Sequence, residues 1–522
     1  MNSTTPGPLS WSLSTLPLDV VSSLADNQLA VGSAAAAAAG LAWYLLRSEE
    51  GQVKRIRPLP FLGQWAFFTK RYDFIVDGFK KFPKETAFGF GLLGLYAKHD
   101  VVALRGEEAR KAFFSRGDLS FTEGYQILFG GGPSTKDIAK SNANRNDHEE
   151  LSFFLRHLTP LLKMDRLAQL TPDLMSDIER NMQTWGETGK FDPFDVMYST
   201  VFQLTIRAAG AREIADSVEK CKQLEELYWK VEKGNTAASL LLPWLPSSAR
   251  KQKIDATTEI YLIFDEIIKT RQRENRREED ALQTFIDQGD STADIIGFIM
   301  GTLFAGIVNT GLMSAWIFIF LDQVPEWRDK VIDEIRTLLD KHAPLAEYPD
   351  STAERFSKIP PQVWENEMPV LEACIRETIR LIVSGAALRR IISGDTVIDG
   401  KNIPNGTFLV YSTGETHLDP SIYPNPTEYN PGRYSADQDK NQTYGFLGWG
   451  VGRHPCAGKR FAQYEIKSMV AMFLASYTYE VIDSNGKKPD PSVTVPDKNN
   501  LYQARPKGQT FYVKYTKRKQ QL

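Results

Sequence analysis

The chain has 522 residues, of which 42% are hydrophobic and 24% charged, and this composition excludes a disordered chain, a collagen-like chain and a polytopic membrane bundle. The formal net charge of −3 provides no overall basic field, so we expect no nucleic-acid partner. The three cysteines, Cys221, Cys374 and Cys456, cannot form a disulfide framework and indicate a folded part that faces a reducing compartment.

An uncharged stretch near the N-terminus predicts a single transmembrane helix over residues 27–46. At about 1.5 Å per residue this stretch reaches about 30 Å, the thickness of the hydrocarbon core. Trp43 and Tyr44 near its end suit a membrane interface. Two alternatives are a cleaved signal peptide, which the absence of basic residues before the stretch disfavours, and a soluble alanine-rich helix.

Basic residues follow the predicted span, and prolines follow the basic residues. By the positive-inside rule, basic residues that follow the span lie in the cytosol; they are Arg47, Lys54, Arg55 and Arg57. The N-terminus, with the sequon at Asn2, is then expected in the lumen and the remainder of the chain in the cytosol. The prolines in the run 57–60 (RPLP) disfavour helix and predict a hinge. We therefore divide the chain into an anchor with a basic linker, 1–57, and one catalytic domain, 58–522.

The body shows long helical patterns and short strand patterns, which predict a mainly α fold with small β-sheets. The predicted helices are 161–185, 254–273, 292–321, 325–339, 365–382 and 458–477. The predicted strands are 97–104, 396–398, 407–412, 479–482 and 510–515.

The segment 449–458 (WGVGRHPCAG) places Cys456 in a glycine-rich loop before a predicted helix. Glycines there would let the backbone approach a flat object and turn N–H groups toward the sulfur, and the helix N-terminus would favour a thiolate. No second cysteine or histidine pair lies nearby at zinc spacing, so one thiolate would be the sole protein ligand of a preassembled cofactor such as haem. The alternative is a buried structural cysteine in a tight turn.

This segment resembles the haem-binding loop of the cytochrome P-450 superfamily, with Trp449 in the place of the usual Phe and His454 in the place of the usual Arg or His. The run 377–380 (ETIR) is similar to the family's Glu-x-x-Arg, and the runs 417–420, 423–426 and 429–434 are similar to its meander. The resemblance implies the P-450 fold, haem b with iron on the Cys456 thiolate, and cofactor contacts from Gly452 and Gly458. It also implies a structural triad of Glu377, Arg380 and Arg433.

The centre of the predicted helix 292–321 resembles the family's distal-helix pattern in the run 304–310 (FAGIVNT). It departs from the pattern at Val308, where an acid is usual, and at Asn309, where a proton-delivering Thr is usual. The resemblance implies catalytic roles for Asn309 and Thr310, and room for oxygen above the ring at Gly306. An Asn amide can still donate and accept hydrogen bonds, so a proton relay remains feasible. Asn in this place is shared with bile-acid 7α-hydroxylases and with prostacyclin synthase.

Cationic partners for the haem propionates are expected at Arg389 and His454, with Arg390 as a competitor. Arg156 is a further candidate, although Ser152 stands where the family usually has Trp in a Trp-x-x-x-Arg pattern. The resemblance also implies pocket walls from a loop over 121–129, from Phe304 and Val308, and from the segment 382–388. These are mostly apolar and suit a lipophilic substrate.

The favoured hypothesis is a membrane-bound haem-thiolate monooxygenase of the endoplasmic reticulum, single-pass, with a cytosolic catalytic domain. It would hydroxylate a lipophilic molecule with O2 and with electrons from an NADPH-dependent flavoprotein reductase, since the chain has no flavin or dinucleotide fingerprint. The run 106–114 and the residues 122–124 look most like fungal microsomal members that serve secondary metabolism. The alternatives are a haem-thiolate isomerase or dehydratase that needs no reductase, suggested by Val308 and Asn309, and a haem-containing sensor without turnover.

Overall fold

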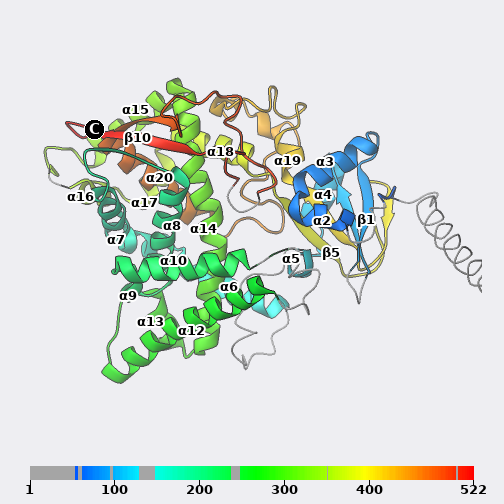
Figure 1. Ribbon diagram of the computed structural model, residues 1–522, viewed down its shortest axis with the longest axis horizontal. Helices are drawn as coiled ribbons and strands as arrows, with labels where there is room; N and C mark the ends of the chain where they lie inside the picture. The colour runs from blue at the N-terminus through cyan, green and yellow to red at the C-terminus, as the bar shows by residue number, and fades with distance from the viewer. Residues whose placement is uncertain are drawn as a thin grey trace, which may run out of the picture. The chain divides into compact units, whose positions relative to one another are not determined.

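The computed structural model describes residues 53–56, 62–93, 98–128, 147–234, 236, 247–349, 351–500 and 504–522 (Figure 1). The chain divides into two units, Met1–Gln52 and Val53–Leu522, of which the second contains all of these residues. The predicted transmembrane span, the sequon at Asn2 and the prolines of the hinge lie outside the described residues. Lys54 and Ile56 already hydrogen-bond to Gly89, both at 2.8 Å, so the second unit begins before the predicted boundary at residue 58.

Helices dominate the fold, as the sequence predicts, and most of the predicted helices are confirmed with small shifts of their ends. The described helices are α2 (Leu62–Thr69), α3 (Arg71–Lys81), α4 (Glu107–Ser115), α5 (Phe121–Leu128), α6 (Asp147–Leu161), α7 (Met164–Gln183), α8 (Pro193–Ala209), α9 (Arg212–Ala215), α10 (Val218–Lys233), α12 (Ser248–Glu274), α13 (Ala281–Gln288), α14 (Thr292–Gln323), α15 (Pro325–His342), α16 (Thr352–Ser357), α17 (Pro361–Asn366), α18 (Pro369–Ile382), α19 (Thr413–His417) and α20 (Lys459–Ser476). Two 3-10 turns, Pro431–Arg433 and Gln438–Lys440, lie in the long connection between α19 and α20.

The strands form three small sheets. A five-stranded sheet has the order β1-β2-β8-β5-β3, a three-stranded sheet has the order β4-β10-β9, and β6 pairs with β7. In the first sheet β2 and β8 are parallel, with Val101 opposite Phe408, and the other pairs are antiparallel. The strands are β1 (Ala87–Leu93), β2 (Lys98–Leu104), β3 (Leu119–Ser120), β4 (Thr188–Phe191), β5 (Ala386–Ile391), β6 (Thr396–Ile398), β7 (Lys401–Ile403), β8 (Phe408–Ser412), β9 (Tyr477–Asp483) and β10 (Phe511–Lys517).

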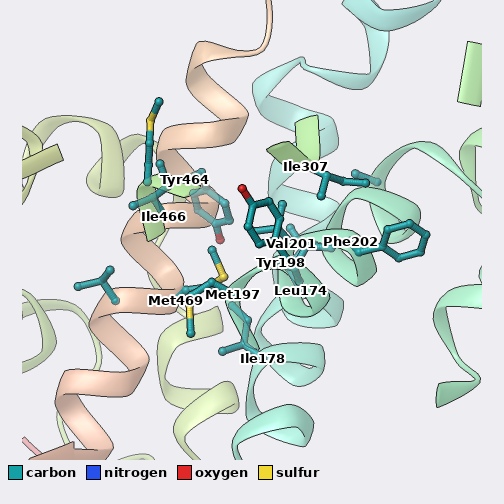
Figure 2. Close-up of a cluster of buried hydrophobic side chains, with 14 of the residues drawn as sticks. Leu174, Ile178, Met197, Tyr198, Val201, Phe202, Ile307, Tyr464, Ile466 and Met469 are labelled. Atoms are coloured by element: carbon teal, nitrogen blue, oxygen red, sulfur yellow. The ribbon is translucent and has the colours of Figure 1, made fainter. Parts of the chain in front are cut away.

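The helix α14 forms the centre of the helical part. It begins where the Ser291 side chain accepts a hydrogen bond from the backbone N–H of Asp294, and it ends before Pro325. It is long and apolar enough to cross a membrane, but about two thirds of its apolar window is buried inside the protein. Figure 2 shows Ile307 of α14 in a cluster with side chains of α7, α8 and α20. α14 is therefore the core helix that positions the residues 304–310.

Two predicted elements differ from the structure. The predicted helix 365–382 is split into α17 and α18, because Pro369 keeps Met368 out of the helical conformation, with φ −125° and ψ 57°, and has no N–H of its own. The side chain of Glu334, on α15, caps the new helix start by accepting hydrogen bonds from the N–H groups of Val370 and Leu371 at 2.7 and 2.9 Å. The segment expected as a loop over 121–129 is the helix α5 as far as Leu128.

Gly311→Ala should destabilise the fold, because a Cβ at this position would lie 2.7 Å from a ring carbon of Tyr198 on α8. Helix propensity alone would favour alanine by about 1 kcal/mol, but overpacking costs about 1–3 kcal/mol. We expect a net loss of up to about 2 kcal/mol in the free energy of unfolding, and a loss of about 1–3 kcal/mol relative to an alanine that packs without strain, measured by urea titration. Gly306→Ala on the same helix is the control, because its Cβ would make only ordinary contact with Thr205 at 3.5 Å. A fully stable Gly311→Ala protein would contradict this packing.

Candidate active site

The glycines of the segment 449–458 have two different roles. Gly450 and Gly452 have positive φ angles of 65° and 64°, and a Cβ at either position would collide with a backbone oxygen, that of His454 or of Phe114. These two glycines therefore shape the loop itself. Gly458 has an ordinary φ of −87°, and a Cβ there would meet no described atom within 4 Å. Of the three, Gly458 alone leaves open space beside Cys456.

Cys456 is the exposed thiol of the chain, whereas Cys221 and Cys374 are buried. Burial raises the pKa of the Cys221 and Cys374 thiols to about 12, so neither is a ready thiolate. Desolvation also raises the pKa of Cys456, but hydrogen bonds from the backbone of Gly458 and Lys459 and the charge of Lys459 act in the opposite direction. The loop is closed by a hydrogen bond of 2.7 Å from the Cys456 N–H to the Trp449 carbonyl oxygen.

Arg389 is a buried cation near the loop. Its side chain is 3% exposed, and its guanidinium lies 5.0 Å from the ring centre of Phe121 and donates to the Leu388 carbonyl oxygen at 2.7 Å. No carboxylate pairs with it among the residues that the structure describes, and desolvation lowers its pKa to about 10. The ring of His454 stacks on Phe121 at 5.2 Å, and the charge of Arg389 helps burial to lower the pKa of His454. Arg389 and His454 therefore both contact Phe121, and Arg389 lies close enough to act on the charge of the loop.

The other two candidate partners for the propionates, Arg390 and Arg156, are paired with a carboxylate or exposed to solvent. Arg390 forms an ion pair of 2.7 Å with Glu123 of α5. Arg156 lies on an exposed position of α6. Of these three arginines, Arg389 is the one that is both buried and without a carboxylate partner in the described part of the chain.

The predicted distal-helix residues lie on different faces of α14. Ala305 and Asn309, four residues apart, are exposed on a helix whose other faces are largely buried. Thr310 and Val308 are buried. Gly306 lies near Thr205 of α8, where an added Cβ would make ordinary contact at 3.5 Å, so packing does not require a glycine there. The structure therefore brings Asn309, and not Thr310 or Gly306, to the open face of α14.

Trp449 carries a polar group that the sequence pattern did not reveal. Its indole Nε1 is buried and has no hydrogen-bond partner among the described residues. Arg389 has no carboxylate partner in the described part of the chain, and Gly458 leaves open space in the same loop. This arrangement fits a flat anionic cofactor whose metal binds Cys456.

Glu377, Arg380 and Arg433 form the predicted triad. Arg380 makes a bidentate pair with Glu377 through two hydrogen bonds of 2.8 Å, and Arg433 adds a third of 3.1 Å. All three side chains are at most 2% exposed. The Asn430 backbone N–H and the Tyr434 hydroxyl also donate to the Glu377 carboxylate, at 3.0 and 3.2 Å. The buried charge therefore ties α18 to the connection that leads to Cys456.

His417 is a structural residue of this region whose role the sequence did not indicate. Its ring is fully buried, and Nε2 accepts a hydrogen bond of 2.9 Å from the backbone N–H of Leu447, two residues before Trp449. Its carbonyl oxygen accepts a hydrogen bond of 2.7 Å from Arg380. Burial and the charge of Arg380 lower the pKa of His417 to about 3, so the ring is neutral and acts as an acceptor.

Comparison with known proteins agrees with this geometry. A family model described as Cytochrome P450 matches residues 55–504. The chain is 29% identical over 439 residues to the cytochrome P450 monooxygenase AacuE of Aspergillus aculeatus, with 82% of this chain and 86% of that protein covered. It is 29% identical over 456 residues to nsrP of Aspergillus novofumigatus, a protein of the same description, with 84% and 86% covered. It is 28% identical over 401 residues to the sterol 14-demethylase of Arabidopsis thaliana, with 73% and 77% covered.

Arg380→Ala should lower the free energy of unfolding by about 3–5 kcal/mol, because it removes the bidentate partner of a buried carboxylate. Arg336→Ala, which breaks an exposed pair with Asp333 on α15, is the control and should cost at most about 0.5 kcal/mol. Denaturant titration of the two variants measures the difference. Equal losses would show that the triad does not hold the fold.

The stability of the protein should decrease as the pH is lowered, because the buried ring of His417 stays unprotonated in the folded state. The folded-state pKa of about 3 lies below the ordinary 6.5, so the unfolded chain binds a proton that the folded chain does not bind between these values. The contribution is fully present above about pH 6.5 and decreases by about 1.4 kcal/mol per pH unit as the pH falls toward 3. We expect His417→Gln to show a shallower loss of stability between pH 7 and pH 5 in urea titrations. A slope identical to that of the unmodified protein would contradict the neutral ring.

Proposed function

The chain belongs to the cytochrome P450 family and is a P450 monooxygenase, and from this premise we propose that it hydroxylates a lipophilic small molecule in fungal secondary metabolism. The observation that carries the proposal is the exposed Cys456 thiol in a loop whose His454 feels the charge of Arg389, a buried cation without a carboxylate partner among the described residues, while the other two thiols are buried. The relatives support the fungal setting, since the printed descriptions of AacuE and nsrP are P450 monooxygenases of two Aspergillus species.

The family implies haem with iron and a cysteine thiolate as the axial ligand, and we assign this ligand to Cys456. Bound haem supplies the activation of O2 for transfer of one oxygen atom to a C–H bond. The N–H groups of Gly458 and Lys459 stabilise the thiolate form of Cys456. Arg389 and His454 are assigned to the propionates, because a buried guanidinium without a carboxylate partner requires an anion. Gly458 gives the open space beside the thiolate, and Gly452 keeps the loop in shape.

Asn309 is the polar side chain that we place at the reacting substrate. It is exposed on α14, and its amide can hold a water molecule by donating from Nδ2 and accepting at Oδ1. Thr310 is buried, and we assign it to the positioning of Asn309. Val308 cannot carry a proton, which leaves the Asn309 amide and ordered water as the route for protons.

A redox partner must deliver electrons to a P450, and we assign this role to an NADPH-dependent flavoprotein reductase. Arg453, Lys459 and Arg460 are exposed around the Cys456 loop and give the reductase a cationic surface. The uncharged stretch 27–46 would anchor the protein in the endoplasmic reticulum membrane, single-pass, with residues 58–522 in the cytosol.

The alternative is an isomerase or dehydratase acting on an oxygenated substrate, and Val308 with Asn309 is the observation that favours it. Such an enzyme needs neither NADPH nor a reductase. Turnover by the purified protein alone, with a peroxide substrate, would establish the alternative, whereas turnover that requires NADPH, reductase and O2 together would exclude it.

Cys456→Ala should abolish the red-shifted Soret band in the carbon monoxide difference spectrum of the dithionite-reduced protein, because the thiolate ligand is lost. Cys221→Ala on α10 is the control and should keep the band. A thiolate-type band in the Cys456→Ala protein would refute the assignment of the ligand.

Arg389→Leu should lower haem retention by about tenfold, measured as the haem remaining after gel filtration, because it removes the buried cation that faces the propionates. Arg390→Leu is matched in size and position but breaks only the partly exposed pair with Glu123, so we expect full haem content. Equal haem loss in both proteins, or in neither, would contradict the assignment of Arg389.

A further inference from the structure

A tyrosine of α8 forms a hydrogen bond to the backbone of α14 at its centre. Tyr198 is 2% exposed, and its hydroxyl donates to the Val308 carbonyl oxygen at 3.3 Å. Figure 2 shows its side chain in the same buried cluster as Ile307 of α14. Desolvation raises the pKa of Tyr198, so the hydroxyl keeps its proton at neutral pH and acts as the donor. The Val308 oxygen therefore has a hydrogen-bond donor from outside its own helix.

A glycine of α14 lets the tyrosine ring approach this closely. A Cβ at Gly311 would lie 2.7 Å from a ring carbon of Tyr198, so any larger residue would push the ring away. The ring of Trp229 on α10 also packs against Tyr198, edge to face, at 5.3 Å and 84°. Since glycine inside a helix is unfavourable relative to alanine, the slot at Gly311 has a cost that the contact with Tyr198 offsets. The position of the hydroxyl is thus set by packing from two other helices.

The hydrogen bond of Tyr198 acts on the peptide group that leads into Asn309. Gly311 follows Asn309 by two residues, about 200° around the helix at about 100° per residue, so Tyr198 does not face the Asn309 side chain. The carbonyl oxygen of Val308, however, lies in the planar peptide group that also contains the N and Cα atoms of Asn309. An additional donor draws a helical carbonyl outward from the helix axis. The donor therefore influences the direction in which the Asn309 side chain leaves α14.

The amide of Asn309 has no other support in the described part of the chain. It is exposed, and no described residue forms a hydrogen bond with its side chain. Its orientation therefore depends on the backbone of α14. We propose that Tyr198 is a positioning residue that orients Asn309 through the Val308 peptide group. This inference rests on the proposed role of Asn309 at the reacting substrate.

The test measures the position of Asn309 by infrared spectroscopy, with carbon monoxide bound to the dithionite-reduced haem protein as the probe. A hydrogen-bond donor near the oxygen of carbon monoxide lowers the C–O stretching frequency, and the Asn309 amide is such a donor. Asn309→Ala should therefore raise this frequency. The measurement requires no substrate and reads the surroundings of the bound ligand, which a general loss of stability does not change.

Tyr198→Phe keeps the ring and removes only the hydroxyl. We expect part of its C–O band to move to the frequency of Asn309→Ala, because fewer molecules hold the amide in place. The ratio of the original band to the moved band should fall by about threefold, a modest change since 3.3 Å is long for a hydroxyl donor. Gly311→Ala, whose Cβ would displace the Tyr198 ring, should change the band in the same direction.

Tyr479→Phe is the matched control. The Tyr479 hydroxyl also donates to a backbone carbonyl of α14, that of Phe318, at 2.9 Å, but Phe318 lies nine residues beyond Asn309. We expect this variant to leave the C–O band unchanged. In the double variant Tyr198→Phe with Asn309→Ala, the band should equal that of Asn309→Ala alone, because the effect of Tyr198 passes through Asn309.

A C–O band of Tyr198→Phe identical to that of the unmodified protein would overturn the inference. Equal changes in Tyr198→Phe and Tyr479→Phe, or a further change in the double variant, would also overturn it, since they would show a general effect on α14. A band that moves in Asn309→Ala but not in Tyr198→Phe rejects only the role of Tyr198. An unchanged band in Asn309→Ala would instead reject the proposed role of Asn309, and the inference with it.

Discussion

One buried carboxylate holds together the parts of the chain that surround the candidate active site. Glu377 lies in α18, and its two arginine partners and the Asn430 N–H come from α18 and from the connection toward Cys456. A buried anion requires such partners, because its desolvation cost is otherwise several kcal/mol. Arg380 extends the cluster to the backbone of His417 and Pro426, and His417 in turn receives the N–H of Leu447. The position of the Cys456 loop therefore depends on charges located far from it in the sequence.

In this loop, opposing effects act on the ionisation of the Cys456 thiol. Desolvation disfavours the thiolate of Cys456, whereas the start of α20 and Lys459 favour it. Close backbone contacts, such as the hydrogen bond of 3.0 Å from the Arg453 N–H to the Phe114 carbonyl oxygen, fix the loop against α4. These contacts hold the backbone of the loop, and the N–H groups of Gly458 and Lys459 hydrogen-bond to the sulfur.

Much of the fold could be predicted from the sequence where the signal is local. α14 is a long, mostly apolar run between a serine cap and a proline, and its predicted start at Thr292 is confirmed. α8 was missed, because side chains on all of its faces are buried and leave no helical period. α5 was expected as a loop, and it packs against a strand that is distant in the sequence: a Cβ added at Gly124 would lie 2.7 Å from the Arg389 backbone. The triad residues were identifiable from motifs, but the burial of Arg389 without a carboxylate partner among the described residues is a property of tertiary packing that no local pattern contains.

The parallel pairing of β2 with β8 has a consequence for the synthesis of the chain. This sheet joins residues 98–104 to residues 408–412, and Arg110 and Tyr411, which share a hydrogen bond beside it, are 301 residues apart. At about 5–20 residues per second, translation of that interval takes about 15–60 s. During this time β2 has an unpaired edge and an apolar face, which are the features that chaperones bind and that promote aggregation. Expression of this protein should therefore be limited by the supply of chaperones during translation more than by the stability of the finished fold.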